Sequence, residues 1–191
     1  MGNLVIDMSM SLDGYIAAPN DNPQQGLGED GMRLHNWAFD DPSVFERVYG
    51  NLVEETGAVI MGRRSYDNSI EAWGGKGPLG DVPCFVVTHR PLEPPDPLFT
   101  VTDGIESALA KAQEAAGEKR IGLMGANIDQ QFIAAGLVDE IRIHVVDVLL
   151  GGGRRLFDEL PQRVELERTG LSQTGGVTHL EYRVLHSAPD G

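Results

Sequence analysis

The stretch AVIMGRRSYD, residues 58–67, decides the fold more than any other part of the chain. Its first four residues have the length and composition of a buried strand, and Gly62 ends that strand abruptly. Ligands of open α/β sheets bind beyond the carboxyl ends of such strands. Two guanidinium groups beside a hydroxyl suit a phosphate dianion, although a solvated arginine pair in a turn fits this segment alone equally well. The candidate anion-binding residues here are Arg63, Arg64 and Ser65.

Composition and charge limit the possible functions. The chain has 191 residues, 41% hydrophobic and 23% charged, which is typical of one globular domain, and we expect a single domain over residues 1–191. Its formal net charge is −14. Because a protein this acidic repels polyanions, we expect no nucleic-acid partner. A local basic pair in such a chain favours a specific anion site.

The sequence also bears on location and on metals. No segment approaches the roughly 18 consecutive apolar residues that a membrane helix needs, so we expect no membrane partner. The N-terminus lacks the basic start and apolar core of a signal peptide, and a cytoplasmic location follows by elimination. The single cysteine, Cys84, excludes an internal disulfide and a multi-cysteine metal site, and we expect no metal. Its apolar surroundings predict a buried, inert thiol.

Hydrophobic periodicity predicts alternating strands and helices. A helix begins at Asp41-Pro42 and ends at Gly57, and residues 17–36 form a long loop of the kind that often serves as a lid. This order predicts an α/β fold with a mostly parallel central sheet, helices on both faces and an antiparallel C-terminal edge. The expected strands lie at residues 3–11, 58–61, 84–87, 99–101, 121–124, 139–150, 164–173 and 179–185, and the two further helices at 103–117 and 127–136.

Three of the expected strands end in groups suited to anions. Discrete cations follow the first two strands, at residues 62–65 and at Thr88, His89 and Arg90, and suit a terminal phosphate monoester. The third strand ends in small residues that open a helix, and a helix N-terminus suits a pyrophosphate. A pyrophosphate site plus a monoester site is what NADPH requires. The residues of the third strand end are Gly125, Ala126, Asn127 and Ile128.

As a set, AVIMGRRSYD, CFVVTHR and RIGLMGANIDQQFI resemble the dihydrofolate reductase fold. MSLDGYIA near the start and DVLLGGGRRLF late in the chain resemble one branch of it, which includes the reductase domain of the bifunctional riboflavin-biosynthesis deaminase–reductase. The likeness runs from Asn3 to Leu185, and its motifs are specific only together. It implies a dihydrofolate reductase-like three-layer fold, NADPH as cofactor and a homodimer.

The resemblance also implies roles for single residues. Arg63 and Arg64 match the pair that holds the 2′-phosphate after Gly62, and Ser65 matches the hydroxyl residue that starts a helix at the pyrophosphate. Residues 88–90 match the strand end that flanks the adenosine and its 2′-phosphate, and residues 125–128 match the turn under the pyrophosphate. Arg63→Ala together with Arg64→Ala is therefore expected to weaken NADPH binding more than NADH binding.

Two carboxylates are the catalytic candidates. Asp13 and Gly14 match the S-x-D-G segment beside the nicotinamide, although Asp-Gly is also a common turn pair. A gapless count back from Gly62 places Glu46 at the helix-borne carboxylate of pterin-reducing members. Glu46 lies roughly 110° from the centre of the helix's apolar stripe, at its margin. In a cleft it would bind an aminopyrimidine ring or assist protonation; the alternative is an ordinary solvated glutamate.

Two further segments leave alternatives open. His35 and Trp37 follow the long loop and either close over a substrate or, for Trp37, anchor the packing. Residues 151–155, GGGRR, either cradle a phosphate or form the bend before the last hairpin.

The sequence thus predicts an NADPH-dependent reductase. Its small-molecule substrate carries a conjugated C=N or C=O and belongs to the pterin, pyrimidine or ribosylamino-pyrimidine class. The alternative is an NADPH-binding module without turnover, because folds persist with altered function. Oxidation of NADPH in the presence of candidate acceptors separates the two.

Overall fold

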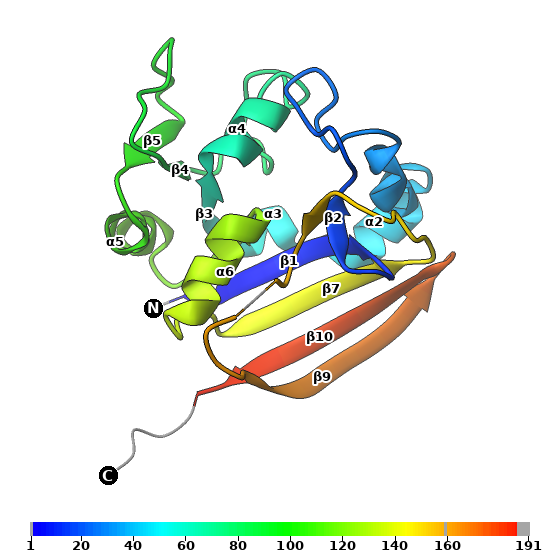
Figure 1. The fold of residues 1–191 in the computed structure, drawn as a ribbon. Helices are drawn as coiled ribbons and strands as arrows, with labels where there is room; N and C mark the ends of the chain where they lie inside the picture. The colour runs from blue at the N-terminus through cyan, green and yellow to red at the C-terminus, as the bar shows by residue number, and fades with distance from the viewer. Residues whose placement is uncertain (1, 159, 187–191) are drawn as a thin grey trace.

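The computed structural model describes residues 2–158 and 160–186, and Figure 1 shows their fold. The strands of the main sheet are β1 (Leu4–Ser11), β3 (Thr56–Gly62), β4 (Cys84–Val87), β5 (Phe99–Thr102), β6 (Arg120–Met124), β7 (Glu140–Val146), β9 (Glu165–Thr174) and β10 (Val177–Leu185). Within the described residues they form one eight-stranded sheet in the order β5-β4-β3-β6-β1-β7-β10-β9. Neighbours from β5 to β7 are parallel, whereas β10 runs antiparallel to both β7 and β9. The predicted α/β class with an antiparallel C-terminal edge is confirmed.

Helices cover both faces of this sheet (Figure 1). The helices are α1 (Asn36–Phe39), α2 (Pro42–Tyr49), α3 (Leu52–Glu55), α4 (Arg63–Ser69), α5 (Ile105–Ala116) and α6 (Ala126–Ala134), with a short 3₁₀-helix, η1 (Gly31–Leu34). Helices α5 and α6 pack on one face, and α1, α2 and α4 pack on the other, so the predicted three layers are confirmed. Among the described residues, none of the helices combines the length and apolar character needed to span a bilayer.

The apolar run of β3 is buried from both sides. Ala58 and Ile60 face the cluster formed with α5 and α6, whereas Val59 and Met61 face the cluster formed with the α4 segment. A strand that is buried on both faces needs a continuous apolar run, which explains why this stretch indicates a parallel sheet. Cys84 is buried in the second cluster, and burial raises the pKa of its thiol to about 12. The prediction of an inert thiol there is consistent with this protonated state.

Several expected boundaries were wrong. The helix expected over residues 41–57 is broken at Gly50 into α2 and α3, and Gly57 belongs to β3. Asp41 does cap α2, since its carboxylate accepts a hydrogen bond from the Ser43 N–H at 2.9 Å. The strand expected over residues 139–150 ends at Val146.

The periodicity missed other elements. Residues 63–69 form α4, which only the resemblance implied, through Ser65; its polar, mostly half-buried residues give little apolar periodicity. The long loop of residues 17–36 contains η1, and two short strands, β2 (Tyr15–Ala17) and β8 (Arg154–Arg155), pair in a separate small sheet. The single domain expected over residues 1–191 stays a prediction, because residues 1, 159 and 187–191 lie outside the described residues.

One polar group in the core lacks a partner. Asp129 on α6 is fully buried, and neither of its carboxylate oxygens has a hydrogen-bond partner among the described residues. Burial raises the pKa of Asp129 well above its usual value of 3.8. The pKa of Asp129 is therefore higher in the folded protein than in the unfolded chain. Its protonation contributes fully to the free energy of unfolding below pH 3.8, and this contribution is lost as the pH rises through the folded pKa.

We therefore expect Asp129→Ala to be more stable than the parent protein at pH 7. The gain should be about 1–3 kcal/mol, the typical cost of an unsatisfied buried polar group, and it should shrink below pH 4. Urea denaturation at pH 3.5 and pH 7 measures both values. Gln131→Ala, an exposed position on the same helix, is the control. A difference between Asp129→Ala and the parent that does not change with pH would contradict this interpretation.

Candidate functional site

A cleft of about 520 Å³ lies at the carboxyl ends of β3 and β6, beside β1. This volume is in the usual range for small-molecule sites. The structure brings the predicted strand ends together here, since most of the predicted cofactor residues line this one cleft. They are Gly62, Arg63, Arg64, Ser65, Arg90, Gly125, Ala126, Asn127 and Ile128.

Two helices begin at the cleft, and neither has a side-chain cap among the described residues. Gly62 precedes α4, and Gly125 precedes α6. The φ angle of Gly125 is +107°, and a side chain at this position would collide with the Ser65 hydroxyl. Glycine therefore allows the two helix N-termini to approach one another. Their free N–H groups and partial positive charge favour an anion in the cleft.

Arg63 forms a first basic cluster with Arg90. Its Nε donates a hydrogen bond to Asp67 Oδ1 at 2.7 Å, and its Nη1 donates to the carbonyl oxygens of Arg90 and Pro91 at 3.2 and 3.0 Å. Arg90 Nη2 lies 3.8 Å from the other oxygen of Asp67. One aspartate thus orients both guanidinium groups at the end of β4. We call Arg63, Arg90 and Asp67 the β4-end cluster.

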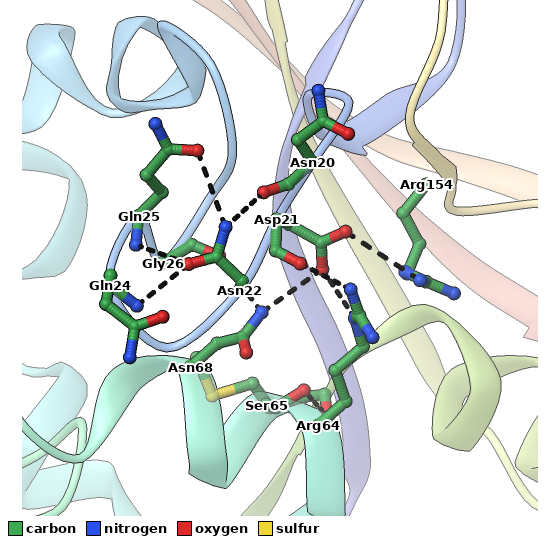
Figure 2. A network of polar contacts seen from close by, with 11 residues as sticks. Asn20, Asp21, Asn22, Gln24, Gln25, Gly26, Arg64, Ser65, Asn68 and Arg154 are labelled. Atoms are coloured by element: carbon green, nitrogen blue, oxygen red, sulfur yellow. Dashed lines mark hydrogen bonds and ion pairs between the residues drawn. The ribbon is translucent and has the colours of Figure 1, made fainter.

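Arg64 points away from this cluster and toward the loop before η1 (Figure 2). Its Nε donates to Asp21 Oδ2 at 2.6 Å, Asn68 Nδ2 donates to the same oxygen at 3.1 Å, and Arg154 Nη2 lies 3.8 Å from Asp21 Oδ1. The predicted pair Arg63–Arg64 is therefore divided between two clusters. We call Arg64, Arg154 and Asp21 the loop cluster.

Asp21 remains charged within the loop cluster. Burial alone would raise the pKa of its carboxyl group, but the hydrogen bond from Arg64 and the charges of Arg64 and Arg154 outweigh burial and lower it. Only 11% of the Asp21 side chain is exposed. Sequence reasoning missed Asp21 because it stands in a polar loop without periodicity. It also left the role of residues 151–155 open, and the structure places Arg154 in the lining of the cleft.

Thr88 and His89 do not line the cleft as the structure describes it. Thr88 Oγ1 accepts a hydrogen bond from the N–H of Arg90 at 3.1 Å, so Thr88 shapes the turn that presents Arg90. His89 is exposed and close enough to Asp103 to lower the pKa of that carboxyl, though the hydrogen bond from Ser107 has the largest effect on it. The predicted contact of Thr88 and His89 with the cofactor is not supported by this placement.

Asp13 and Gly14 also lie outside the cleft lining. The Asp13 carboxylate accepts hydrogen bonds from Ser11 Oγ at 2.6 Å and from the N–H groups of Leu150 and Gly151 at 3.1 and 2.7 Å. The Ser11 hydrogen bond is the largest cause of the lowered pKa of Asp13, with burial opposing it and the two N–H groups adding to it. Asp13 thus holds the bend at residues 150–151 against the end of β1. These contacts favour the turn interpretation of Asp13, and its catalytic role stays a prediction.

Glu46 is the second catalytic candidate. It lies exposed on α2, and it is not among the described residues that line the cleft. Its side chain lies against Gly50, where α2 ends. This exposed position is consistent with the other interpretation of the sequence, an ordinary solvated glutamate.

Sequence reasoning missed a buried polar network on β1, β7 and β10. Asp7 Oδ1 receives hydrogen bonds from Tyr49 Oη at 3.1 Å and from His144 Nε2 at 2.9 Å. His144 Nδ1 lies 2.7 Å from His179 Nδ1, and His179 Nε2 lies 2.5 Å from Thr174 Oγ1. Burial, then the neighbouring His144, lowers the pKa of His179 to about 4. The pairing of β7 with β10 would have indicated this network, because it places His144 directly opposite His179 on adjacent strands.

Trp37 packs against the two histidines of this network. It is therefore a packing anchor, which was one of the two interpretations of the sequence. Its indole N–H donates to Ser9 Oγ at 3.1 Å. The ring centroid lies 4.8 and 4.9 Å from those of His144 and His179. His35, two residues earlier, lines the cleft instead.

Residues 3–180 match the sequence model of the RibD C-terminal domain. Two uncharacterized proteins of Bacillus subtilis (strain 168) are similar over nearly their whole length. YwjB is 27% identical over 179 residues, covering 93% of this chain and 95% of YwjB. YyaP is 24% identical over 194 residues, covering 94% and 93%.

Two solved structures share the fold. A protein of Shewanella sp. PV-4, whose name connects it with riboflavin biosynthesis, superposes with a TM-score of 0.75 at 24% identity and covers 97% of this chain and 100% of its own. RibD of Acinetobacter baumannii superposes with a TM-score of 0.65 at 16% identity, covering 97% of this chain and 59% of RibD. Given the match over residues 3–180, the chain belongs to the RibD C-terminal domain family, reductase domains with the dihydrofolate reductase-like fold.

Proposed function

We propose that the protein is an NADPH-dependent reductase that transfers a hydride to the conjugated C=N or C=O of a small heterocyclic substrate. One observation supports this proposal above all others. Within the described residues of a chain with a net charge of −14, four arginines gather on one cleft at the N-termini of α4 and α6. A site of this kind suits a ligand with several phosphates.

The division into two clusters suggests how a dinucleotide would bind. Arg154 of the loop cluster also lines a neighbouring pocket with Ala126 and Asn127, at the N-terminus of α6. The loop cluster and that N-terminus therefore suit the pyrophosphate. The β4-end cluster suits the 2′-phosphate, because its two guanidinium groups stand together at the end of β4 and neither lines the pocket at the N-terminus of α6.

The rest of the cleft suits the reacting end of the cofactor. Met8, Ile16 and Leu27 line it together with His35 and Ser9. A bound NADPH would supply the hydride, while this chain binds the cofactor, orients it and limits the access of water. Apolar walls at the reacting end favour that exclusion of water.

The test has two parts. Titration calorimetry with NADPH measures binding, and the loss of NADPH absorbance in the presence of pterins, pyrimidines and quinones measures turnover. We expect saturable NADPH binding and oxidation that depends on at least one acceptor class. Failure of NADPH to bind would contradict the proposal.

A second candidate function is an NADPH-binding module without turnover. The observation that favours it is specific, since both predicted catalytic carboxylates, Asp13 and Glu46, lie outside the cleft lining of the described structure. NADPH binding without oxidation by any acceptor of the panel would support this alternative.

Asp21 competes with any anion for the loop cluster, which gives a further prediction. Asp21→Asn keeps the shape of the side chain and removes its negative charge from Arg64 and Arg154. We expect this variant to bind NADPH roughly 3- to 10-fold more tightly, because one charge-assisted contact no longer has to be displaced. Calorimetry measures the change.

Asp81→Asn, an exposed aspartate whose side chain is 87% accessible, is the matched control and should leave the affinity unchanged. Weaker NADPH binding by Asp21→Asn than by the control would show instead that Asp21 is needed to hold the arginines in place.

A further inference from the structure

His35 presents a polar group to the cleft that the protein itself does not use. It stands between η1 and α1 and lines the cleft. Its Nδ1 is buried and has no hydrogen-bond partner among the described residues. Because Nδ1 is buried while the residue lines the cleft, we take Nε2 as the ring nitrogen that meets a ligand there.

The ring is neutral near pH 7, and the environment selects one tautomer. Burial, together with the nearby His144, lowers the pKa of His35 to about 4. A neutral ring carries its proton on one nitrogen only. A buried N–H without a partner is rarer than a buried acceptor without one, which favours the proton on Nε2. His35 would then offer one uncharged N–H donor to the cleft.

The surroundings of His35 differ from those of the arginines. The η1 segment packs against β1 and β2, and these strands contribute Met8 and Ile16 to the cleft lining. The two basic clusters come instead from α4, the turn after β4, and β8. An uncharged donor in a cleft with apolar lining residues suits an uncharged flat ring with an acceptor atom, whereas the arginines supply the charge that favours a phosphate.

We propose that His35 is a recognition residue for the substrate, whose Nε2–H donates a hydrogen bond to a carbonyl oxygen or ring nitrogen of a neutral heterocycle. This inference rests on the proposed function, because it assigns the substrate part of the same cleft. His35 binds and orients the ring. It does not supply the proton of the reduction, because the N–H of a neutral imidazole is a far weaker acid than that of an imidazolium.

The experiment measures binding of pterin (2-amino-4-oxopteridine) by its fluorescence, with the protein free and saturated with NADP⁺. His35→Phe keeps an aromatic ring and removes the donor, whereas His35→Gln keeps a side-chain N–H. We expect pterin to bind about 10-fold more weakly to His35→Phe and within about 3-fold of the parent to His35→Gln, the usual scale of one buried hydrogen bond. NADP⁺ affinity should be unchanged in both variants.

His186→Phe makes the same change at a histidine outside the cleft lining, with a side chain that is 47% exposed, and this control should leave pterin binding unchanged. Equal pterin binding by His35→Phe and the parent would overturn the proposal, as would no pterin binding by the parent. Nitrogen-15 NMR of the parent gives an independent result, because a proton found on Nδ1 of His35 overturns the assigned tautomer and with it the donor. If NADP⁺ binds but pterin binding does not depend on His35, the inference about His35 is wrong and the proposed cofactor site is unaffected. If pterin binding depends on His35 but NADP⁺ does not bind, only the proposed function is contradicted.

Discussion

We expect the double variant Arg63→Ala/Arg90→Ala to bind NADPH on the order of 100-fold more weakly and to bind NADH almost as well as the parent protein. Both guanidinium groups are oriented by Asp67 at the end of β4 and are the best placed for a 2′-phosphate. Two charge-assisted contacts contribute about 3 kcal/mol together, and NADH lacks the group that they would hold.

Arg64→Ala/Arg154→Ala is the matched comparison, because it removes the same number of charges from the same cleft. In the proposed binding mode the loop cluster holds the part of the ligand that NADPH and NADH share, so we expect both cofactors to lose affinity to a similar extent. Calorimetric titration of each variant with each cofactor measures the four values. An equal loss of NADPH and NADH in Arg63→Ala/Arg90→Ala would contradict the assignment of the 2′-phosphate to the β4-end cluster.

The second large effect concerns stability and the buried network. Asp7→Ala leaves the Tyr49 hydroxyl and the His144 Nε2–H without an acceptor in a site where only 5% of the His144 side chain is exposed. Burial, and then the Asp7 charge, already raise the pKa of Tyr49 well above its usual value, so this hydroxyl stays protonated and needs an acceptor. We expect Asp7→Ala to lower the free energy of unfolding by about 3 kcal/mol. Urea denaturation at pH 7 measures the loss.

Asp81→Ala removes a carboxylate that is 87% exposed and pairs only loosely with Lys76, at 3.7 Å. Its effect should stay below about 0.5 kcal/mol, as is usual for surface substitutions. If Asp7→Ala and Asp81→Ala unfold at the same urea concentration, the network does not stabilise the fold in the way described.

The fold was predictable because its strands are short, apolar and bounded by turn residues. Residues 58–61 must be buried on both faces, and that requirement is visible in the sequence. The convergence of residues 62–65, Arg90 and 125–128 on one cleft follows from the parallel sheet, since parallel strands end at the same edge. At these positions the hydrophobic pattern of the sequence and the topology of the sheet predict the same location for the cleft.

The direction of single side chains was not predictable from local pattern. Arg63 and Arg64 are adjacent, but consecutive residues of a helix point about 100° apart, and α4 sends their guanidinium groups to different aspartates. The sequence left open whether Glu46 faces the cleft or the solvent, because a residue at the margin of an apolar stripe can do either, and in the structure it is exposed. The partners of Asp13 and Asp21 lie far along the chain, at residues 150–151 and at Arg64 and Arg154, and only the folded chain brings them together.

The crystal structure of the complex with NADPH tests the central claim most directly. We expect the 2′-phosphate within hydrogen-bond distance of Arg63 and Arg90, and the pyrophosphate at the N-terminus of α6, beside Arg64 and Arg154. A cofactor bound outside the cleft, or bound with its adenosine phosphate away from the β4-end cluster, would contradict it.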